Sequence, residues 1–422
     1  MIVSNLLDSV STGFLDGVVL EKIGTANLNW IGKIIQWLIE GVGIVGLGII
    51  LFTLILKTIV LPLDVYSRIK TKKQSLMMEK MRPEMEKLQK QYANDKQMYS
   101  QKVMELQKAN GFSMFGACIP LIVSLVIFMV VFSAFSTYSQ YANLNAYNNM
   151  VDAYNASVKE FVLTDENGAT VKENGFLIAG RDEATGKVEY FVNFDKFLTC
   201  YESDNSENKP AIAENFASLS EGAKKEYVGN YIRVGARQAS AQYYRSHKQS
   251  FIWVGNIWYP DSMLDKEIQS FSKFSSSISR AVGSGVDSSY EDSYNEVVAD
   301  LGKEKKTYNG YFVLIVAAIG LMFLQQFIAM RSQKAANDLG TVDGSGARTT
   351  KWMMILMPII YGIISFFYSA AFSIYMITNT LYSLITTVII NKALDVAFKK
   401  KEEKQAIEHL SKRNSNNRKR LK

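Results

Sequence analysis

Thiol and imidazole groups are scarce in this sequence of 422 residues, which has two cysteines and two histidines. Cys118 begins a long apolar run and Cys200 lies in a polar region, so we expect no disulfide between them. His247 and His409 both lie in polar segments, which excludes a histidine-based zinc site or catalytic triad within the apolar runs.

Motifs of enzymatic chemistry are missing as well. The sequence contains no phosphate-binding glycine loop, no cluster with metal-ligand spacing and no nucleophile elbow. His247 is more typical of a structural or solvated residue than of a catalytic one. We therefore expect a protein that is not an enzyme and that has no catalytic residue, metal or cofactor.

Long apolar runs are what the sequence does have, and 48% of its residues are hydrophobic. A helix needs about 20 apolar residues to cross a bilayer. The last apolar stretch is too long for one crossing and has a small, polar break at 368–371. The sequence thus predicts five spans, at 42–63, 115–138, 311–330, 352–368 and 372–391.

Charge is distributed unevenly between these spans. Lys and Arg outnumber Asp and Glu by 11 to 6 in 64–111, by 4 to 2 in 331–351 and by 11 to 4 in 391–422. The balance is 18 to 24 in 138–310 and 2 to 4 in 1–41. Short basic segments face the cytoplasm. We therefore expect a multi-pass membrane protein with its N-terminus outside and its C-terminus in the cytoplasm.

The predicted fold class is an all-α polytopic membrane protein of five transmembrane helices, with a cytoplasmic helical hairpin and an α+β extracellular insertion. Residues 1–41 form an extracellular N-terminus whose tryptophans favour an interfacial helix over a mere start of the first span. The other segments outside the spans are the hairpin at 64–110, the insertion at 139–310, a cytoplasmic loop at 331–351 and a basic tail at 392–422.

The insertion is large enough to be a domain. We expect 139–160 to prolong the second span as a helix, 175–194 to form a β-hairpin and 210–246 to be helical. The aromatic run Phe251–Asp261 is expected at the outer membrane interface. The serine-rich stretch 270–289 is expected to be flexible.

The hairpin carries an apolar stripe rich in methionine, which is a flexible side chain suited to varied apolar partners but also common in protein cores. The stripe predicts a surface that contacts client proteins, the alternative being a solvated hairpin without a partner. Its candidate client-contacting residues are Met77, Met78, Met81 and Met85, and Asp95 is the candidate N-cap of its second arm.

Lys57 is the one charged residue inside the five predicted spans. A cation there costs roughly 2.5–3.5 kcal/mol on insertion scales. The aliphatic part of its side chain is long enough for the ammonium group to snorkel toward the membrane edge. The alternative is a cation that faces a polar groove and awaits an anionic guest. Other polar residues in the spans support a groove: Thr53, Ser124, Gln325, Gln326, Tyr375, Asn379 and Thr380.

Several short segments together resemble the YidC-type membrane protein insertases, the bacterial branch of the YidC/Oxa/Albino family. The matching segments are Leu54–Leu63, Met81–Met85, Cys118–Pro120, Phe251–Trp253, Pro260–Asp261, Phe323–Gln326 and Lys351–Met354 with Pro358. The resemblance as a whole covers about 250 residues, namely all five spans, the hairpin and the aromatic outer run, and it implies a location in the bacterial plasma (inner) membrane. The large insertion makes the chain similar to a Gram-positive-like form with an enlarged extracellular loop.

The resemblance implies a hydrophilic groove that is open to the cytoplasm and lipid, with a basic residue on the first span. Family members usually have arginine where this chain has Lys57, so the charge is kept but the guanidinium fork is lost. Ser124, Val126 and Met376 also depart from the residues usual in the family.

The predicted function is therefore a membrane protein insertase and chaperone. Nascent membrane proteins and the lipid bilayer are the expected partners, with the ribosome, the Sec translocon and the signal recognition particle pathway as further candidates. The basic tail would contact the ribosome or anionic lipid through Lys399, Lys400, Lys401, Arg418, Lys419 and Arg420. An alternative is an anion or small-solute transporter that uses Lys57, disfavoured because no internal repeat is evident. A surface receptor would need a signalling domain that the sequence lacks.

Overall fold

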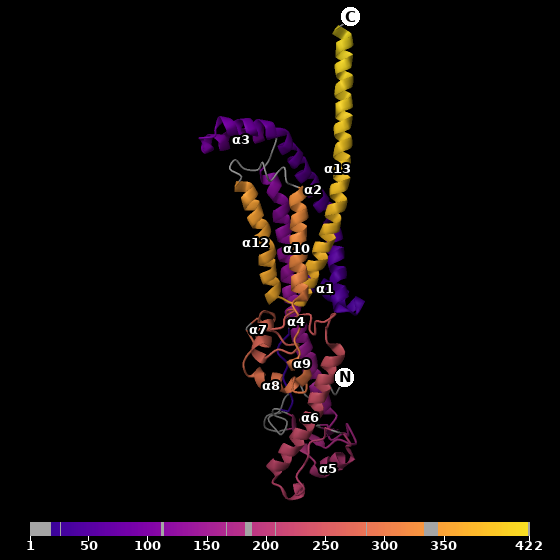
Figure 1. Ribbon diagram of the computed structural model, residues 1–422. Coiled ribbons are helices and arrows are strands. Elements are labelled where there is room, and N and C mark those ends of the chain that lie inside the picture. The colour runs from indigo at the N-terminus through magenta and orange to yellow at the C-terminus, as the bar shows by residue number, and fades with distance from the viewer. Residues whose placement is uncertain are drawn as a thin grey trace. The chain divides into compact units, whose positions relative to one another are not determined.

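The structure is a computed structural model that describes residues 18–25, 27–110, 114–165, 167–181, 188–206, 208–283, 285–332 and 345–420. The elements before the insertion (Figure 1) are helices α1 (Trp30–Val42), α2 (Val45–Gln91), α3 (Lys96–Ala109) and α4 (Met114–Lys159). Strands β1 (Val162–Thr164), β2 (Leu177–Arg181) and β3 (Val188–Val192) follow. The remaining elements are helices α5 (Phe194–Ser203), η2 (Phe216–Ser218), α6 (Glu221–His247), α7 (Phe271–Val282), α8 (Tyr290–Val297), α9 (Gly302–Lys306), α10 (Val313–Ser332), α12 (Ser345–Phe367) and α13 (Ala370–Arg420).

The chain divides into two compact units. The insertion unit comprises Met1–Trp30 with Thr137–Asn309, and the helical unit comprises Ile31–Ser136 with Gly310–Lys422. Helix α4 belongs to both, because it continues without a break past the end of its apolar run. The prediction that 139–160 prolongs the second span is thus confirmed.

In the helical unit, α13 packs against α2 and α10, and α10 also packs against α12. Aromatic rings bring α4 into the same unit: Phe128 meets Tyr361 with ring centroids 5.0 Å apart, and Phe135 meets Tyr375 at 5.4 Å. Gly362 lets α12 approach α10 closely, since a Cβ there would lie 2.6 Å from the Cδ1 of Ile319.

Three helices among the described residues are long and apolar enough to cross a membrane: Val45–Gln91, Leu125–Lys159 and Ala370–Lys404. They overlap the first and second predicted spans and contain the fifth. Two shorter apolar helices, Val313–Ala329 and Pro358–Phe367, fall within the third and fourth. The break predicted at 368–371 is present, because α12 ends at Phe367 and α13 begins at Ala370. Five crossings remain a prediction.

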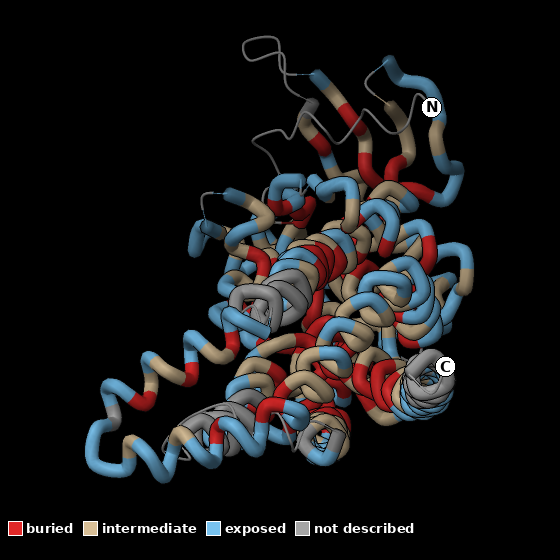
Figure 2. Tube along the Cα trace, turned by 90° about the horizontal axis from the view of Figure 1, so that it is seen from above, coloured by how far each residue is buried: buried red, intermediate tan, exposed pale blue. Residues whose placement is uncertain are grey.

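Many large apolar side chains of these helices are exposed; Figure 2 marks the exposed residues of the chain in pale blue. Ile59 on α2 is 71% exposed, Phe367 on α12 is 76% exposed and Ile389 on α13 is 61% exposed. Apolar patches of this extent are rare on proteins that face water. A lipid environment explains them.

The end of α2 and the short helix α3 form a helical hairpin. The side chain of Asp95 accepts a hydrogen bond from the Met98 amide at 2.9 Å, which caps α3 at the residue expected from sequence. The two arms pack through a small apolar cluster of Met78, Met81, Met85, Tyr99 and Val103. Although Pro62 and Pro83 lie inside it, α2 is continuous over 47 residues.

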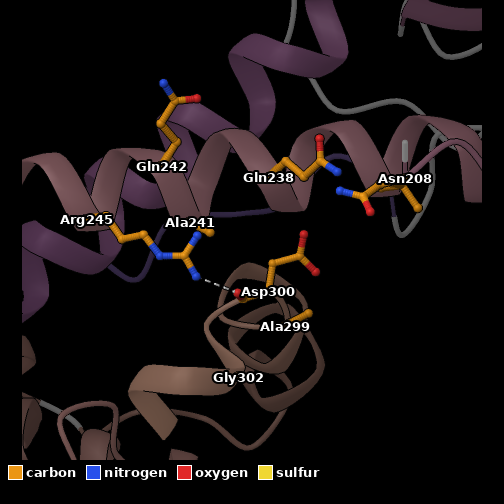
Figure 3. Close-up of a pocket in the computed structure, with 9 residues that line it drawn as sticks. Asn208, Gln238, Ala241, Gln242, Arg245, Ala299, Asp300 and Gly302 are labelled. Atoms are coloured by element: carbon orange, nitrogen blue, oxygen red, sulfur yellow. Dashed lines mark hydrogen bonds between the residues drawn. The ribbon is translucent and has the colours of Figure 1, made fainter. Parts of the chain in front are cut away.

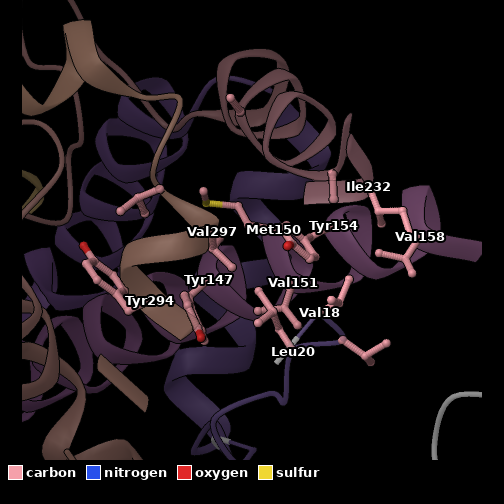
Figure 4. Close-up of a cluster of buried hydrophobic side chains, with 14 of the residues drawn as sticks. Val18, Leu20, Tyr147, Met150, Val151, Tyr154, Val158, Ile232, Tyr294 and Val297 are labelled. Carbon is pink, nitrogen blue, oxygen red and sulfur yellow. The ribbon is translucent and has the colours of Figure 1, made fainter. Parts of the chain in front are cut away.

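The core of the insertion unit is built on the second half of α4 (Figure 4). Met150, Val151 and Tyr154 pack there with Ile232 of α6 and Val297 of α8. The segment before α1 is held against α4 by side-chain amides: Asn155 accepts from the Leu20 amide at 3.0 Å and donates to the Leu20 carbonyl at 2.8 Å.

The sheet of this unit has the order β1-β2-β3. The predicted β-hairpin is present as the antiparallel pair β2 and β3, with Leu177 opposite Val192. Strand β1, which pairs in parallel with β2, was not expected.

The prediction that 270–289 is flexible is wrong for its first part, which is helix α7. Phe271, Phe274 and Ile278 lie on one side of that helix and are buried in the core. The burial of these three apolar residues outweighs the serine-rich composition.

Candidate functional site

The predicted groove residues lie mainly on two helices that pack against each other, α2 and α13. On α2, Thr53, Lys57, Asp64, Arg68 and Lys72 are spaced by four or seven residues, so they follow one face of the helix. Thr53 is fully buried and donates a hydrogen bond to the Ile49 carbonyl at 2.7 Å. Lys57 is half-buried.

Two polar contacts fix the alignment of these helices. An Nη of Arg68 donates to the hydroxyl of Thr387 at 2.7 Å, and Lys72 forms an ion pair with Asp395 at 2.6 Å. Arg68 contacts a residue of α13 that is 319 positions further along the chain, and Lys72 contacts one that is 323 positions further. The contacted position on α13 rises with the position on α2, so the two helices run in the same direction. With the same rise in both helices, Lys57 lies level with residues 376–380 of α13.

The buried side of α13 is rich in small hydroxyl side chains, namely Ser373, Thr380, Ser383 and Thr387. Their spacing of seven, three and four residues places them on one face. The hydroxyl oxygens of Ser373 and Thr380 have no hydrogen-bond partner among the described residues. A buried polar group without a partner costs free energy, on the order of 1–3 kcal/mol. Ser373 and Thr380 thus leave two unpaired hydroxyl groups on a buried helix face.

The charges around Lys57 come from its own helix. Asp64 and Arg68 lie close enough to act on it electrostatically, with opposite signs. No ion pair within 4 Å joins Lys57 to an acid in the part of the chain that the structure describes. The nearest acidic influence, Asp64, follows the predicted span rather than lying within it.

The remaining predicted groove residues are placed less closely together. Tyr375 is buried in the aromatic cluster with Phe135, and Thr380 is 1% exposed on the hydroxyl face. Gln325 and Gln326 are half-buried on α10, as is Asn379 on α13. Ser124 belongs to α4, but its side chain lies outside the described residues.

The predicted client-contacting methionines lie mostly inside the hairpin. Met78, Met81 and Met85 are 2–3% exposed between the arms, and Met77 is half-buried beside them. In the tail, Lys399, Lys400 and Lys401 are exposed on α13. The side chains of Arg418, Lys419 and Arg420 lie outside the described residues.

Sequence reasoning missed Ser373, Ser383, Thr387 and Arg68. The spacing of the hydroxyl residues was a usable signal, because it puts one polar face on an otherwise apolar helix. Arg68 had been assigned to the hairpin, although it sits one turn beyond Asp64 on the same face as Lys57.

The insertion unit has a hollow of about 820 Å³ beside α6 (Figure 3), lined in part by Asn208, Gln238, Gln242, Arg245 and Asp300. Arg245 is already engaged there, since it donates to Glu304 at 2.7 Å and to the Asp300 carbonyl at 3.0 Å. Among the lining residues that the structure describes, no nucleophile is paired with a base.

Comparison with known proteins places these helices in a family. The family model of the 60Kd inner membrane protein matches residues 37–164 and 241–400. The matched stretches contain α2, α3, the polar face of α13 and the aromatic run Phe251–Asp261. The unmatched stretch between them lies in the insertion unit.

Curated relatives carry the name membrane protein insertase YidC. One from Fusobacterium nucleatum is 41% identical over 91 residues, which is 22% of this chain and 42% of that protein. One from Oceanobacillus iheyensis is 34% identical over 109 residues, or 24% and 42% of the two chains. One from Caldanaerobacter subterraneus is 27% identical over 113 residues, or 27% and 53%. The matches thus span about half of each relative or less. Since the family model covers more than half of the sequence, this chain belongs to the 60Kd inner membrane protein family, the family of the YidC insertases.

Proposed function

We propose that this protein is a membrane protein insertase and chaperone, in which Lys57 and the hydroxyl face of α13 form a hydrophilic intramembrane groove. The observation that carries the proposal is a half-buried cation level with buried hydroxyl groups that lack partners within the described chain. Family membership and the name of the relatives support it.

Lys57 would hold an acidic group of the client segment that is crossing the membrane. A carboxylate loses much of its hydration on leaving water, and an opposite charge in a site of low dielectric offsets part of that cost. Asp64, seven residues from Lys57, attracts the same ammonium group. The client carboxylate must therefore displace this weaker interaction. The hydroxyl groups of Ser373 and Thr380 would bind main-chain groups of the same segment.

The hairpin would meet the client first. Its methionines are closed between the arms, so they would contact an apolar client only when α3 swings away from α2. Few contacts hold the arms together, and a small cluster of this kind opens at low cost. Met77, at the edge of the cluster, would be the first of the four to reach the client.

The groove would open to the cytoplasm, with the N-terminus outside and the C-terminus inside, as the charge balance of the short segments favours. Nascent membrane proteins would be the substrates. The basic end of α13 would bind the ribosome, and the Sec translocon and the signal recognition particle pathway are further candidate partners.

Reconstitution in liposomes tests the proposal. Insertion of a single-span client should be measured by protease protection, alongside chloride and phosphate flux in the same vesicles. Client protection that requires this protein, without solute flux, is the expected result. Flux without client insertion would favour the alternative of an anion or small-solute transporter that uses Lys57.

The ribosome contact has a separate test. Because 391–422 carries 11 basic and 4 acidic residues, co-sedimentation with ribosomes should weaken when 399–422 is deleted and when salt is raised. Unchanged co-sedimentation in both experiments would rule the contact out without affecting the insertase proposal.

A further inference from the structure

Two turns of the insertion unit hold apolar side chains away from the protein. Ile252 is 71% exposed and Leu264 is 69% exposed, while Met263 beside Leu264 is 44% exposed. The residues around them are not loose, since Val254, Asp261 and Ser262 are buried. The apolar tips are thus presented by an ordered framework, which we call the turn pair (251–254 and 261–264).

The first turn holds Ile252 in a costly conformation. Backbone hydrogen bonds in both directions between Phe251 and Val254, at 3.1 and 3.0 Å, leave only Ile252 and Trp253 in the loop. Ile252 has φ 56°, in the left-handed region. Glycine, asparagine or aspartate usually occupies such a position, and a β-branched residue there is strained. Such strain is typical of sites where the side chain itself is needed.

The second turn is tied to the first. The indole nitrogen of Trp253 donates to the carboxylate of Asp261 at 3.2 Å. The hydroxyl of Ser262 accepts from the Leu264 amide at 2.9 Å, so the backbone at the tip is satisfied locally. What remains uncovered at both tips is hydrocarbon.

The residues that flank the turn pair, Gly255 and Asp265, are bonded to Asn309, which comes shortly before α10 in the sequence. The carbonyl of Asn309 accepts from the Gly255 amide at 3.2 Å, and its amide donates to the Asp265 carbonyl at 2.9 Å. Helix α10 begins four residues later at Val313. Four residues reach at most about 14 Å.

Trp258, which lies between the two turns in sequence, makes a second contact, with α4. The ring of Trp258 lies 4.9 Å from that of Tyr138, and the Trp258 carbonyl accepts from the Ser139 hydroxyl at 2.9 Å. Both partners belong to α4, directly after its apolar run. Trp and Tyr are enriched where helices leave the bilayer.

Lysines predominate among the exposed charges beside the turn pair. Lys303 and Lys306 are exposed on α9, and Lys266 lies 3.5 Å from the centre of the Tyr308 ring. Of the acids nearby, Glu304 is paired with Arg245 and Asp265 with Lys273, while Asp300, just before α9, is exposed. Lysine and tyrosine next to apolar tips suit phosphate headgroups above acyl chains.

We propose that the turn pair inserts into the membrane surface, with Ile252, Met263 and Leu264 in the headgroup and upper acyl region and the lysines on lipid phosphates. The insertion unit would then be held to lipid at a place distinct from the groove. The inference does not depend on the insertase proposal, since it needs only that α4 and α10 enter the membrane.

Depth-dependent fluorescence quenching in nanodiscs tests this in the full chain. Cys118 and Cys200 are replaced by alanine, and a single cysteine at Ile252→Cys or Leu264→Cys carries an environment-sensitive dye. Phe191→Cys is the matched control, because Phe191 is also an exposed apolar residue of this unit, at 54%. The discs contain phosphatidylcholine and phosphatidylglycerol, with bromine at a shallow or a deep acyl position.

Both turn labels should be blue-shifted and quenched several-fold more by the shallow bromines than the label at 191, since an interfacial segment sits about 5–10 Å deep. The label at Leu264 keeps the test valid if Ile252→Cys disturbs its turn. Quenching no stronger than at 191 would overturn the proposal. A blue shift without bromine quenching would also overturn it, because protein rather than lipid would then cover the tips.

Charge is tested with the labelled Leu264→Cys protein. Lys303→Gln with Lys306→Gln should reduce quenching in discs containing phosphatidylglycerol. Lys224→Gln with Lys225→Gln on α6 is the matched control and should leave it unchanged. An equal effect of both pairs would remove the lysines from the proposal.

Discussion

The two units differ in how they pair their buried polar groups. In the insertion unit, Glu304 is 7% exposed and receives hydrogen bonds from Arg245, while Glu296 is bonded by Arg237 at 2.6 Å and by the Tyr154 hydroxyl at 3.0 Å. In the helical unit, Ser373 and Thr380 are at least as deeply buried and lack partners within the described residues. The insertion unit thus pairs these acids internally, although its Tyr147 hydroxyl also lacks a partner, and the helical unit leaves two hydroxyl groups of one helix face unpaired.

The difference separates stability from function. Paired acids such as Glu304 need nothing further, so their role is to hold α6, α8 and α9 together. Hydroxyl groups left without partners destabilise the fold that contains them. Their position at the level of Lys57 is explained if a client segment supplies the missing hydrogen-bond partners.

The largest effect is expected at Lys57. Lys57→Glu should abolish insertion of a client with an aspartate in its translocated segment, since like charges repel. Lys57→Gln should lower it by about tenfold, because a hydrogen-bonded charge pair is worth roughly 1.5 kcal/mol net, and about 1.4 kcal/mol is a factor of ten. Lys57→Arg should be tolerated. Insertion is measured in vivo by protease accessibility.

A client without the aspartate is the control for this series. Lys57→Gln should affect it little. If both clients insert equally through the Lys57→Gln and Lys57→Glu proteins at normal expression, Lys57 only anchors α2 by snorkelling, and charge capture is wrong.

Arg245→Met tests the completed contacts of the insertion unit. It leaves the buried Glu304 without its partner, which should destabilise this unit by about 1–3 kcal/mol. Amide exchange of α6 and α9 in the full-length protein measures the loss. The control on the same helix is Lys225→Met, whose pair with Glu221 is exposed and worth about 1 kcal/mol at most. Equal effects would mean that burial does not distinguish the two pairs.

Acid should weaken the same contact. The hydrogen bond from Arg245, opposed by burial, holds the pKa of Glu304 below its ordinary value of 4.5. The unfolded chain therefore takes up this proton first, so the stabilisation is present above pH 4.5 and is lost as the pH falls through the lower, folded value. Protection of α9 should fall over that range in the natural protein. Arg245→Met should lack this part of the acid response.

The smallest effect on stability, with the opposite sign, is expected on α13. Thr380→Val and Ser373→Ala remove hydroxyl groups that lack partners, so thermal stability in detergent should be unchanged or rise by about 1 kcal/mol. Insertion should nevertheless fall. Thr53→Val is the control, because its hydroxyl is bonded to Ile49 and its loss should not stabilise. Full insertion by the Thr380→Val, Ser373→Ala protein would show that these groups serve packing only.

Sequence reasoning was most reliable where periodicity and length are local. The apolar runs, the cap at Asp95 and the pair of strands β2 and β3 are all set by neighbours in sequence. Strand β1 has three residues and pairs in parallel with a strand beyond a loop, so its pattern is too short to recognise. Helix α7 was not predicted, because its serine-rich composition is typical of flexible segments.

The candidate site was predictable in part. Lys57 is conspicuous as a charge in an apolar run, and Thr53 and Thr380 could be placed on spans. Which face of α13 is buried depends on packing against α2 and α10, which no local pattern reveals. The bond from Arg68 to Thr387 joins residues 319 apart and was invisible for the same reason.

Because α2 is continuous, a movement of the hairpin is transmitted along the helix to the groove. Lys57 and Met81 are carried by one helix, about 36 Å apart along its axis at 1.5 Å per residue. A sideways force on the hairpin arm therefore tilts or rotates the helix at Lys57, unless the helix bends between Lys57 and Met81. Pro62 is the place to yield, since its missing N–H leaves the carbonyl one turn earlier without its helical bond. A chain that docks on the hairpin would thereby turn the cation that receives it.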